Sequence, residues 1–425
     1  MPKLKELWRR DTTHPPPSCP CLSHLQIQGC IVLASLELHS FPLLSKLEIS
    51  GCPKLTSLLL PLSLDSPLSS LLIFECSDLA SLNLHSYPLL SSLNISCCGE
   101  LTSLLVPPSP LLSQFNISSC DKLASLELHS SLLSHLWIYD CPKLTSLLLP
   151  PSPRSELSIL HCGDLAYLEL PSLSQLCIED CGHLASLKLS SSPLLSSLTI
   201  SHCPELTTMQ LSSLPCLKTL KLCNVRERVF RQLMLVTDSS LESLYMEGIH
   251  DMESLRRELL AHASTLQRLS ITKCYGLATL PHWISSLTSL TELDIRDCKQ
   301  IAERCRRETG EDWPQIAHIP EIYIKDGEEW IHPECYFRSE IPQLHSQFIT
   351  LHAKCSVFIL LWHFFIFASY MFVKMLRSES SKNFLSNQLL VLCTKLIILL
   401  WVHTLRVLGN TEVWFKYYLS QILPS

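Results

Sequence analysis

The stretch Leu44–Leu60, LSKLEISGCPKLTSLLL, carries a spacing of apolar residues that recurs through most of this chain. The spacing is Leu-x-x-Leu-x-Ile-x-x-Cys-x-x-Leu-x-x-Leu-x-Leu, and about thirteen copies run from Leu22 to Ile301. The cysteine position returns every 19 to 25 residues, at Cys30, Cys52, Cys76, Cys98, Cys120, Cys141, Cys162, Cys181, Cys203, Val225, Ile249, Cys274 and Cys298. A period this short indicates stacked, similar coils of chain rather than one globular core.

Each copy contains two alternating segments, which predict the two walls of a coil. In 46–50 polar and apolar residues alternate, so a strand there buries Leu47 and Ile49 and exposes the other three side chains. The leucines of 55–60 predict the return side. This pattern is typical of leucine-rich repeats. It predicts an α/β solenoid, a leucine-rich-repeat horseshoe with a concave parallel β-sheet and an irregular or short-strand convex side.

The pattern also divides the chain into four predicted parts. Residues 1–21 form a partial N-terminal repeat and a proline-rich loop, and residues 22–301 form a solenoid of about 13 coils. Residues 302–338 form a cap that contains a short helix and protects the last strand from pairing with other chains. In the cap we expect Ile301, Ala302 and Cys305 to pack on the last coil, the charged residues of 303–308 to face water, and Trp313-Pro314 to end the helix. Residues 339–425 form a hydrophobic helical tail.

Charge and cysteine usage narrow the function classes. The net charge of −6 is mild, and the arginines of 226–231 and 304–307 alternate with glutamates, so we expect no nucleic-acid partner. Residues 1–20 have no apolar signal core, which favours a reduced, cytoplasmic protein despite its 21 cysteines. One cysteine per coil predicts an internal column whose S–H groups donate to loop carbonyls, as asparagine does in other leucine-rich repeats.

The sequence lacks the common catalytic and cofactor motifs. It contains no GxxxxGK[ST], HExxH, GxSxG or CxxC motif, so we expect a non-catalytic protein without a cofactor. His14, Cys19, Cys21 and His24 have a spacing that fits no standard zinc finger. The recurrent histidines at the ends of return segments, His39, His85 and His129, are expected to face solvent.

The outward strand positions supply the candidate protein-binding residues, because aromatic and arginine side chains on an exposed sheet are the types that dominate protein contacts. They are Phe74, His135, Trp137, Tyr139, Lys221, Tyr245, Glu247, Arg268 and Arg296. One hypothesis is that Trp137 and Tyr139, helped by Phe74 and Tyr245, mark a binding patch. The alternative is that Trp137 only covers the neighbouring strands.

The end of the array resembles a known family. The runs LPHWISSLTSL (280–290), LDIRDC (293–298), ERC (303–305) and GEDWPQIAHIP (310–320) are similar to the closing segment of plant disease-resistance proteins. These are nucleotide-binding, leucine-rich-repeat receptors of the coiled-coil type. The opening MPKLKELW (1–8) looks like a strand from such a repeat domain, and the resemblance covers about residues 1–325.

The resemblance implies the sensing part of an intracellular immune receptor. Its repeats would recognise a pathogen effector or a guarded host protein and would restrain a nucleotide switch. The family's coiled coil and switch domain do not appear in this sequence, so we expect no nucleotide site and place any switch domain on another chain. The alternative function is a generic, membrane-tethered leucine-rich-repeat scaffold or adaptor.

The tail leaves three interpretations open. Residues 355–373 form a 19-residue apolar run between Lys354 and Lys374, close to the length that spans a bilayer. The second apolar run, 389–402, is shorter and contains Lys395. The tail is therefore a membrane anchor through 355–373, a segment that packs on the array, or translated sequence beyond the family's natural end.

Carbonate extraction of membranes separates these interpretations. A chain anchored through 355–373 stays in the membrane pellet at high pH, because its apolar surface remains in the hydrocarbon layer. Deletion of the residues after Arg338 is the control and should release the chain. Release of the full chain at high pH would exclude the anchor.

Overall fold

A computed structural model gives the fold of this chain. The structure describes residues 6–7, 21–38, 41–60, 66–84, 87–130, 132–150, 156–189, 192–237, 240–249 and 251–325. All of them belong to one compact unit, Met1–Glu328.

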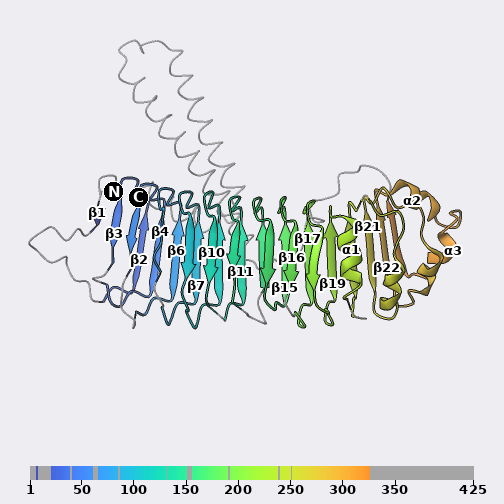
Figure 1. Cartoon of the computed structure of the whole chain (residues 1–425), viewed down its shortest axis with the longest axis horizontal. Coiled ribbons are helices and arrows are strands. Elements are labelled where there is room, and N and C mark those ends of the chain that lie inside the picture. Colours follow the sequence, from blue (N-terminus) through green and yellow to red (C-terminus); the bar gives the residue numbers. More distant parts are fainter. Residues whose placement is uncertain are drawn as a thin grey trace, which may run out of the picture. The chain divides into compact units, whose positions relative to one another are not determined.

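The described residues form a solenoid whose main wall is one sheet of fourteen parallel strands (Figure 1). Consecutive strands in the sheet follow one another along the chain, so each coil lies beside the next. The strands are β2 (His24–Gln28), β4 (Lys46–Ser50), β6 (Ser70–Phe74), β7 (Ser92–Ser96), β9 (Gln114–Ser118), β11 (His135–Tyr139), β13 (Glu156–Leu160), β15 (Gln175–Glu179), β17 (Ser197–Ser201), β19 (Thr219–Cys223), β20 (Ser243–Glu247), β21 (Arg268–Thr272), β22 (Glu292–Arg296) and β23 (Glu321–Lys325).

The strand register places equivalent residues of each repeat side by side. Leu47 of β4 pairs with Leu71 of β6, and Leu71 pairs with Leu93 of β7. These leucines are buried at the second position of each strand, whereas the first, third and fifth residues of β4 and β6 point to the other face. The thirteen strands predicted from the repeat are confirmed, and β23 is a fourteenth that the repeat pattern did not predict.

The return side carries short strands, as predicted, and in the later coils helices, which the repeat pattern did not predict. Three three-stranded parallel sheets line it, and they hold β1 (Glu6–Leu7), β3 (Ser35–Glu37) and β5 (Ser57–Leu59), then β8 (Ser103–Val106), β10 (Ser125–Leu128) and β12 (Ser146–Leu148), then β14 (Tyr167–Leu170), β16 (Ser186–Leu189) and β18 (Thr208–Leu211). In later coils α1 (Glu227–Met234) and the 3-10 helices η1 (Arg257–His262) and η2 (His282–Ser286) take this position. Leucines from both walls fill the single core between them.

The cysteines form the internal column that the repeat predicted. In ten coils the thiol donates to the backbone carbonyl two residues earlier, with Sγ···O distances from 3.3 Å at Cys203 to 3.8 Å at Cys30. Every cysteine that the structure describes is a free thiol. Burial raises the pKa of Cys162 and Cys203 to about 12, so these thiols stay protonated at neutral pH. Protonated thiols fit a packing role better than a nucleophilic one.

A left-handed backbone residue follows every repeat strand from β2 to β22 and was not predicted from the sequence. It precedes the cysteine position and has φ between 49° and 66°, at Gly29, Gly51, Glu75, Cys97, Ser119, Asp140, His161, Asp180, His202, Asn224, Gly248, Lys273 and Asp297. Its N–H donates to the carbonyl of the last residue of the next strand, at N···O distances of 2.7 to 3.1 Å. This turn directs the chain from the sheet toward the core and extends the ladder by one hydrogen bond per coil.

The cap differs in two details from its prediction. Ile301 and Cys305 are buried, as expected, on and beside α2 (Lys299–Arg304). Arg304, expected to face only water, donates from Nη2 and Nε to the buried carboxylate of Asp312 at 2.8 and 2.9 Å. The expectation that Trp313-Pro314 ends a helix is wrong, since α3 (Trp313–Ile316) begins there. Proline suits the first turn of a helix because it needs no N–H partner at that position.

The rest of the cap closes the sheet. Ile322 and Ile324 of β23 pair in register with Leu293 and Ile295 of β22, which continues the inward apolar rows by one strand. Burial by itself would raise the pKa of Asp312, but its hydrogen bonds with Arg304 and with the Leu280 N–H lower it. Asp312 therefore holds the cap to the last coils as a charged group.

Several predictions fall on residues that the structure does not describe. The candidate membrane span 355–373 lies outside the described residues, as do His14, Cys19, His39 and His85. In the described part of the chain, no helix has the length and apolar character needed to cross a membrane. His129 is exposed, as expected.

The left-handed turn generates a prediction. Gly51→Ala should lower the free energy of unfolding by about 1–2 kcal/mol, because φ of +61° costs an L residue about that much and the new methyl group meets no atom closer than 3.4 Å. The matched control is Gly182→Ala, where φ is not positive and no atom lies within 4 Å. It should be neutral or stabilising by about 0.4–1 kcal/mol. Equal denaturation midpoints for the two variants would contradict the role of the turn.

Candidate functional site

The outward face of the fourteen-stranded sheet is the candidate site. All nine predicted residues lie on it, because each occupies the first, third or fifth position of its strand, opposite to the buried second and fourth positions. Phe74 lies on β6; His135, Trp137 and Tyr139 lie on β11; Lys221, Tyr245, Glu247, Arg268 and Arg296 lie on β19 to β22.

The sheet separates these residues into three places. Parallel strands are about 4.8 Å apart, so β6 is about 14 Å from β11, and β11 is about 24 Å from β20. Trp137 and Tyr139 are therefore neighbours, whereas Phe74 and Tyr245 each belong to a different part of the face. A single aromatic patch of all four residues does not form.

The central cluster consists of the side chains of β11. Trp137 pairs in register with Asn116 and Ser158, and Tyr139 pairs with Ser118 and Leu160. Most of these neighbours are small, which leaves the two rings as the largest groups on this part of the face. The ring of Tyr139 meets the His161 ring edge-on, with centroids 5.2 Å apart. Such contacts orient an aromatic side chain.

The C-terminal cluster is charged and internally paired. Lys221 Nζ lies 5.3 Å from the ring centroid of Tyr245, a cation–π contact between β19 and β20. Glu247 contacts Lys273 at 2.9 Å, and Arg296 contacts Asp294 at 2.7 Å. Pairs at partly exposed positions contribute little to stability, and their charges stay available for a partner.

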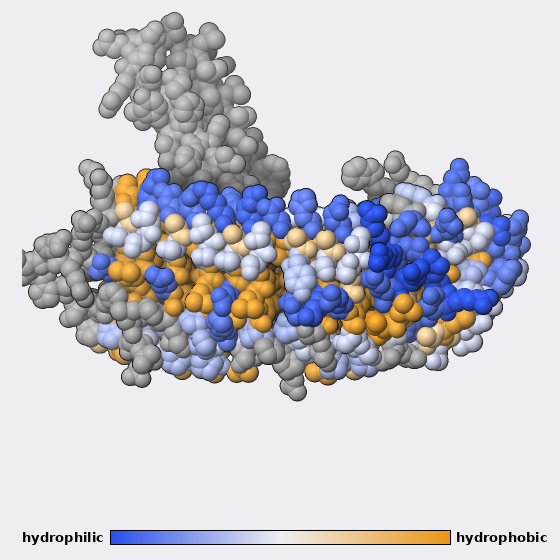
Figure 2. Space-filling model, in the orientation of Figure 1, coloured by the Kyte–Doolittle hydropathy of each residue, from blue (hydrophilic) through white to orange (hydrophobic). Residues whose placement is uncertain are grey.

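The remaining candidates have smaller contacts. Arg268 is exposed and its Nε donates to Ser243 Oγ at 3.2 Å. His135 Nε2 lies 3.4 Å from Glu156 Oε2 across the β11–β13 pair. Phe74 lies between Ser50 and Ser96 in the register. Figure 2 shows strongly hydrophilic residues over the C-terminal quarter of the unit and a hydrophobic band along its N-terminal half in this view.

A second set of candidate side chains was not predicted from the sequence. The left-handed residues present a row of polar groups at the ends of the strands. His161 Nδ1 lies 3.4 Å from Asp180 Oδ2, and His202 Nδ1 lies 3.9 Å from Asp180 Oδ1. His202 Nε2 is 2.7 Å from Asn224 Nδ2. These four residues are 19 to 22 positions apart in the sequence, a spacing that matches no local metal motif. Only their equivalent positions in successive repeats could have indicated this row.

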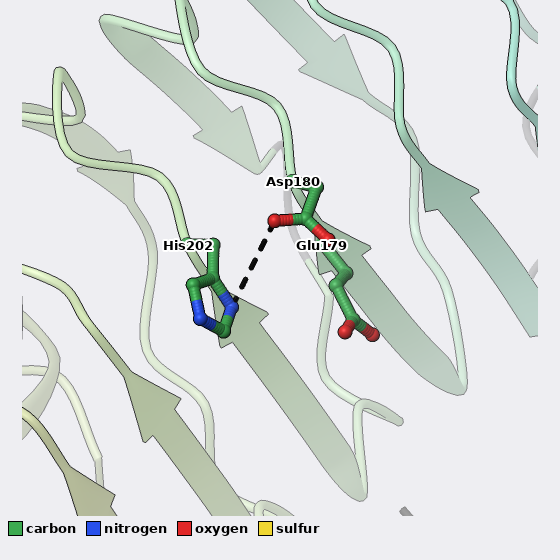
Figure 3. A group of neighbouring side chains, drawn as sticks. All are labelled: Glu179, Asp180 and His202. Atoms are coloured by element: carbon green, nitrogen blue, oxygen red, sulfur yellow. Dashed lines mark ion pairs between the residues drawn. The ribbon is translucent and has the colours of Figure 1, made fainter. Parts of the chain in front are cut away.

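Glu179 joins this row at the end of β15. One ligand atom from each of Glu179, Asp180 and His202 lies within 4.8 Å of the others (Figure 3). Burial and the adjacent Asp180 charge raise the pKa of Glu179, and His161 and His202 lower it. The geometry and the donor types allow these three residues to hold a metal ion.

The comparisons with known proteins found only a short match in sequence and remote matches in structure. No family model matches the chain. A stretch of 51 residues is 37% identical to the "Putative disease resistance protein RGA4" of Solanum bulbocastanum, which covers 12% of this chain and 5% of that protein's length.

Two solved structures are similar at low identity. A leucine-rich repeat protein from Bacteroides ovatus is 13% identical, over 65% of this chain and 78% of that one, with a TM-score of 0.30. A leucine-rich cell surface protein from Faecalibacterium prausnitzii is 12% identical, over 67% and 86%, with a TM-score of 0.16. The leucine-rich-repeat fold of this chain rests on its own strand register and core.

Alternation along β11 generates a stability prediction. Leu136→Ala should lower the free energy of unfolding by about 2–5 kcal/mol, because Leu136 is 5% exposed and its loss leaves a cavity. Trp137→Ala removes a partly exposed ring and should cost clearly less. Denaturation midpoints measure both. Equal losses would show that Trp137 supports the sheet rather than a partner.

Proposed function

We propose that this chain is a non-catalytic, protein-recognition solenoid that binds its partner on the outward face of the fourteen-stranded sheet. The observation that carries this proposal is that Trp137 and Tyr139 lie partly exposed on one strand, among mostly small neighbours. Aromatic residues of this kind concentrate binding energy because they bury a large area with few rotatable bonds.

The dimensions of the face support a protein partner. Fourteen strands at about 4.8 Å give a length of about 60 Å, and strands of five residues give a width of about 16 Å. The product, about 1,000 Å², is comparable with the surface that one partner buries in a standard protein interface. The aromatic centre and the charged C-terminal cluster fit the usual arrangement of an apolar anchor beside polar groups.

The partner class that we propose is a pathogen effector or a guarded host protein, recognised as part of plant defence. The closing segment, 280–320, resembles that of plant disease-resistance receptors, and the short match to the Solanum protein agrees with it. We also propose a nucleotide-binding switch domain as a second partner of this chain. A generic leucine-rich-repeat scaffold is the alternative if the partner has no connection with defence.

The test is co-purification of the full chain from plant tissue challenged with a pathogen. Trp137→Ala should reduce recovery of a specific partner at least tenfold, since central aromatic anchors contribute about 2 kcal/mol or more. Tyr167→Ala is the matched control, because Tyr167 is an aromatic residue 49% exposed on the return strand β14.

The outcomes test recognition by the sheet face separately from the proposed role in defence. A partner lost with Trp137→Ala and retained with Tyr167→Ala supports recognition by the sheet face. The reverse pattern would overturn it. Recovery of the same partner from unchallenged and challenged tissue, with no effect of this chain on effector responses, would favour a scaffold instead.

A further inference from the structure

The row of left-handed residues brings histidine and carboxylate groups together from three coils. His161, Asp180 and His202 follow β13, β15 and β17, and each donates its N–H to the last carbonyl of the next strand, at 2.8 to 3.1 Å. Because these hydrogen bonds hold the three turns in register, their side chains leave the backbone at equivalent points of adjacent coils. A fixed spacing of donor groups is the first requirement of a metal site.

We propose that Glu179, Asp180 and His202 bind a divalent transition metal, with Zn²⁺ as the ion that fits best. One ligand atom from each residue lies within 4.8 Å of the other two, and Figure 3 shows Asp180 directed toward the His202 ring. Ligands at about 2.0–2.1 Å from tetrahedral Zn²⁺ are about 3.3 Å apart. Small side-chain rotations therefore bring the three groups to coordinating distances.

The donor set selects the class of metal. One imidazole nitrogen with two carboxylates suits Zn²⁺ and its neighbours, whereas Ca²⁺ and Mg²⁺ prefer sites made only of oxygen. Two carboxylate charges balance one divalent cation. The side chains of Asp180 and His202 are 38% and 44% exposed, so a fourth ligand can approach from solvent. This is the open arrangement of three protein ligands rather than a closed structural site.

Neighbouring residues orient the ligands. His161 Nδ1 lies 3.4 Å from Asp180 Oδ2, which positions that carboxylate from the side opposite His202. The Asn224 carboxamide lies 2.7 Å from His202 Nε2, and with its oxygen turned toward the ring it accepts the Nε2–H and leaves Nδ1 to the metal. Ser201 Oγ, 2.7 Å from Nδ1, is the group that the metal would displace.

A bound ion would connect two coils by their side chains as well as by their backbones. Glu179 and Asp180 belong to one coil and His202 to the next. The site lies beside the sheet face, and its open position is available to a group from a partner protein. The proposal does not depend on the recognition function, since metal binding is measured without any partner.

The experiment is a calorimetric titration of the full, reduced chain with Zn²⁺. Wild type should bind one equivalent, and His202→Gln and Asp180→Asn should each weaken binding at least tenfold. The matched controls are His183→Gln and Asp164→Asn, which remove the same groups from residues outside the cluster; His183 is exposed and Asp164 pairs with Lys143 at 3.0 Å. Both controls should bind as wild type does. Asn224→Ala should weaken binding about tenfold.

Two further measurements keep the result unambiguous. Melting temperatures without metal must match across the variants, and Glu179→Gln replaces either ligand variant that fails to fold. Co²⁺ reports the ligand atoms, since thiolate ligation adds an intense charge-transfer band and nitrogen and oxygen ligation does not. Three results would each overturn the proposal: no saturable Zn²⁺ binding, wild-type affinity in His202→Gln and Asp180→Asn, or a thiolate band.

Discussion

The hydrogen bond that each left-handed residue makes with the next coil is the constraint on which this structure depends. It occurs after every repeat strand from β2 to β22, always one residue before the cysteine position. Ten of the thirteen residues that adopt this conformation are not glycine, although a left-handed backbone costs an L residue about 1–2 kcal/mol. The chain accepts this cost because the turn both continues the sheet ladder and directs the cysteine into the core.

Stability in such an array is shared between neighbours. The leucines of each strand contact the equivalent leucines of the adjacent strands, and the thiol column fills the space below the turn. No further repeat follows β22 among the described residues, so this end of the sheet is closed by other contacts. The contacts are the Arg304–Asp312 pair, the bond from the Leu280 N–H to Asp312 and the pairing of β23 with β22.

The same register that stabilises the fold also creates the two candidate binding surfaces. Outward strand positions bring residues separated by about one repeat to within one strand spacing, as with Lys221 and Tyr245. The turn positions do the same for Asp180 and His202 at the rim of the sheet. Most outward positions on the strands are only partly buried, although Asn94, Ser96, Thr199 and Ser201 are buried. The alternation along each strand thus separates most core positions from the candidate binding positions.

The sequence by itself determined the coil, the thirteen repeat strands, the faces of those strands and the cysteine column, because apolar spacing directly specifies which side chains are buried. It also assigned the nine candidate residues to one face, since alternation is local. Tertiary structure decided what lies beside what. The stacking of coils sets the distance between Trp137 and Tyr245, the pairing of Arg304 with Asp312, and the grouping of Glu179, Asp180 and His202. The left-handed backbone at Glu75 or His161 could not be predicted from the residue type. The physical reason is that hydrophobic periodicity encodes burial, whereas contacts between coils follow from register in three dimensions.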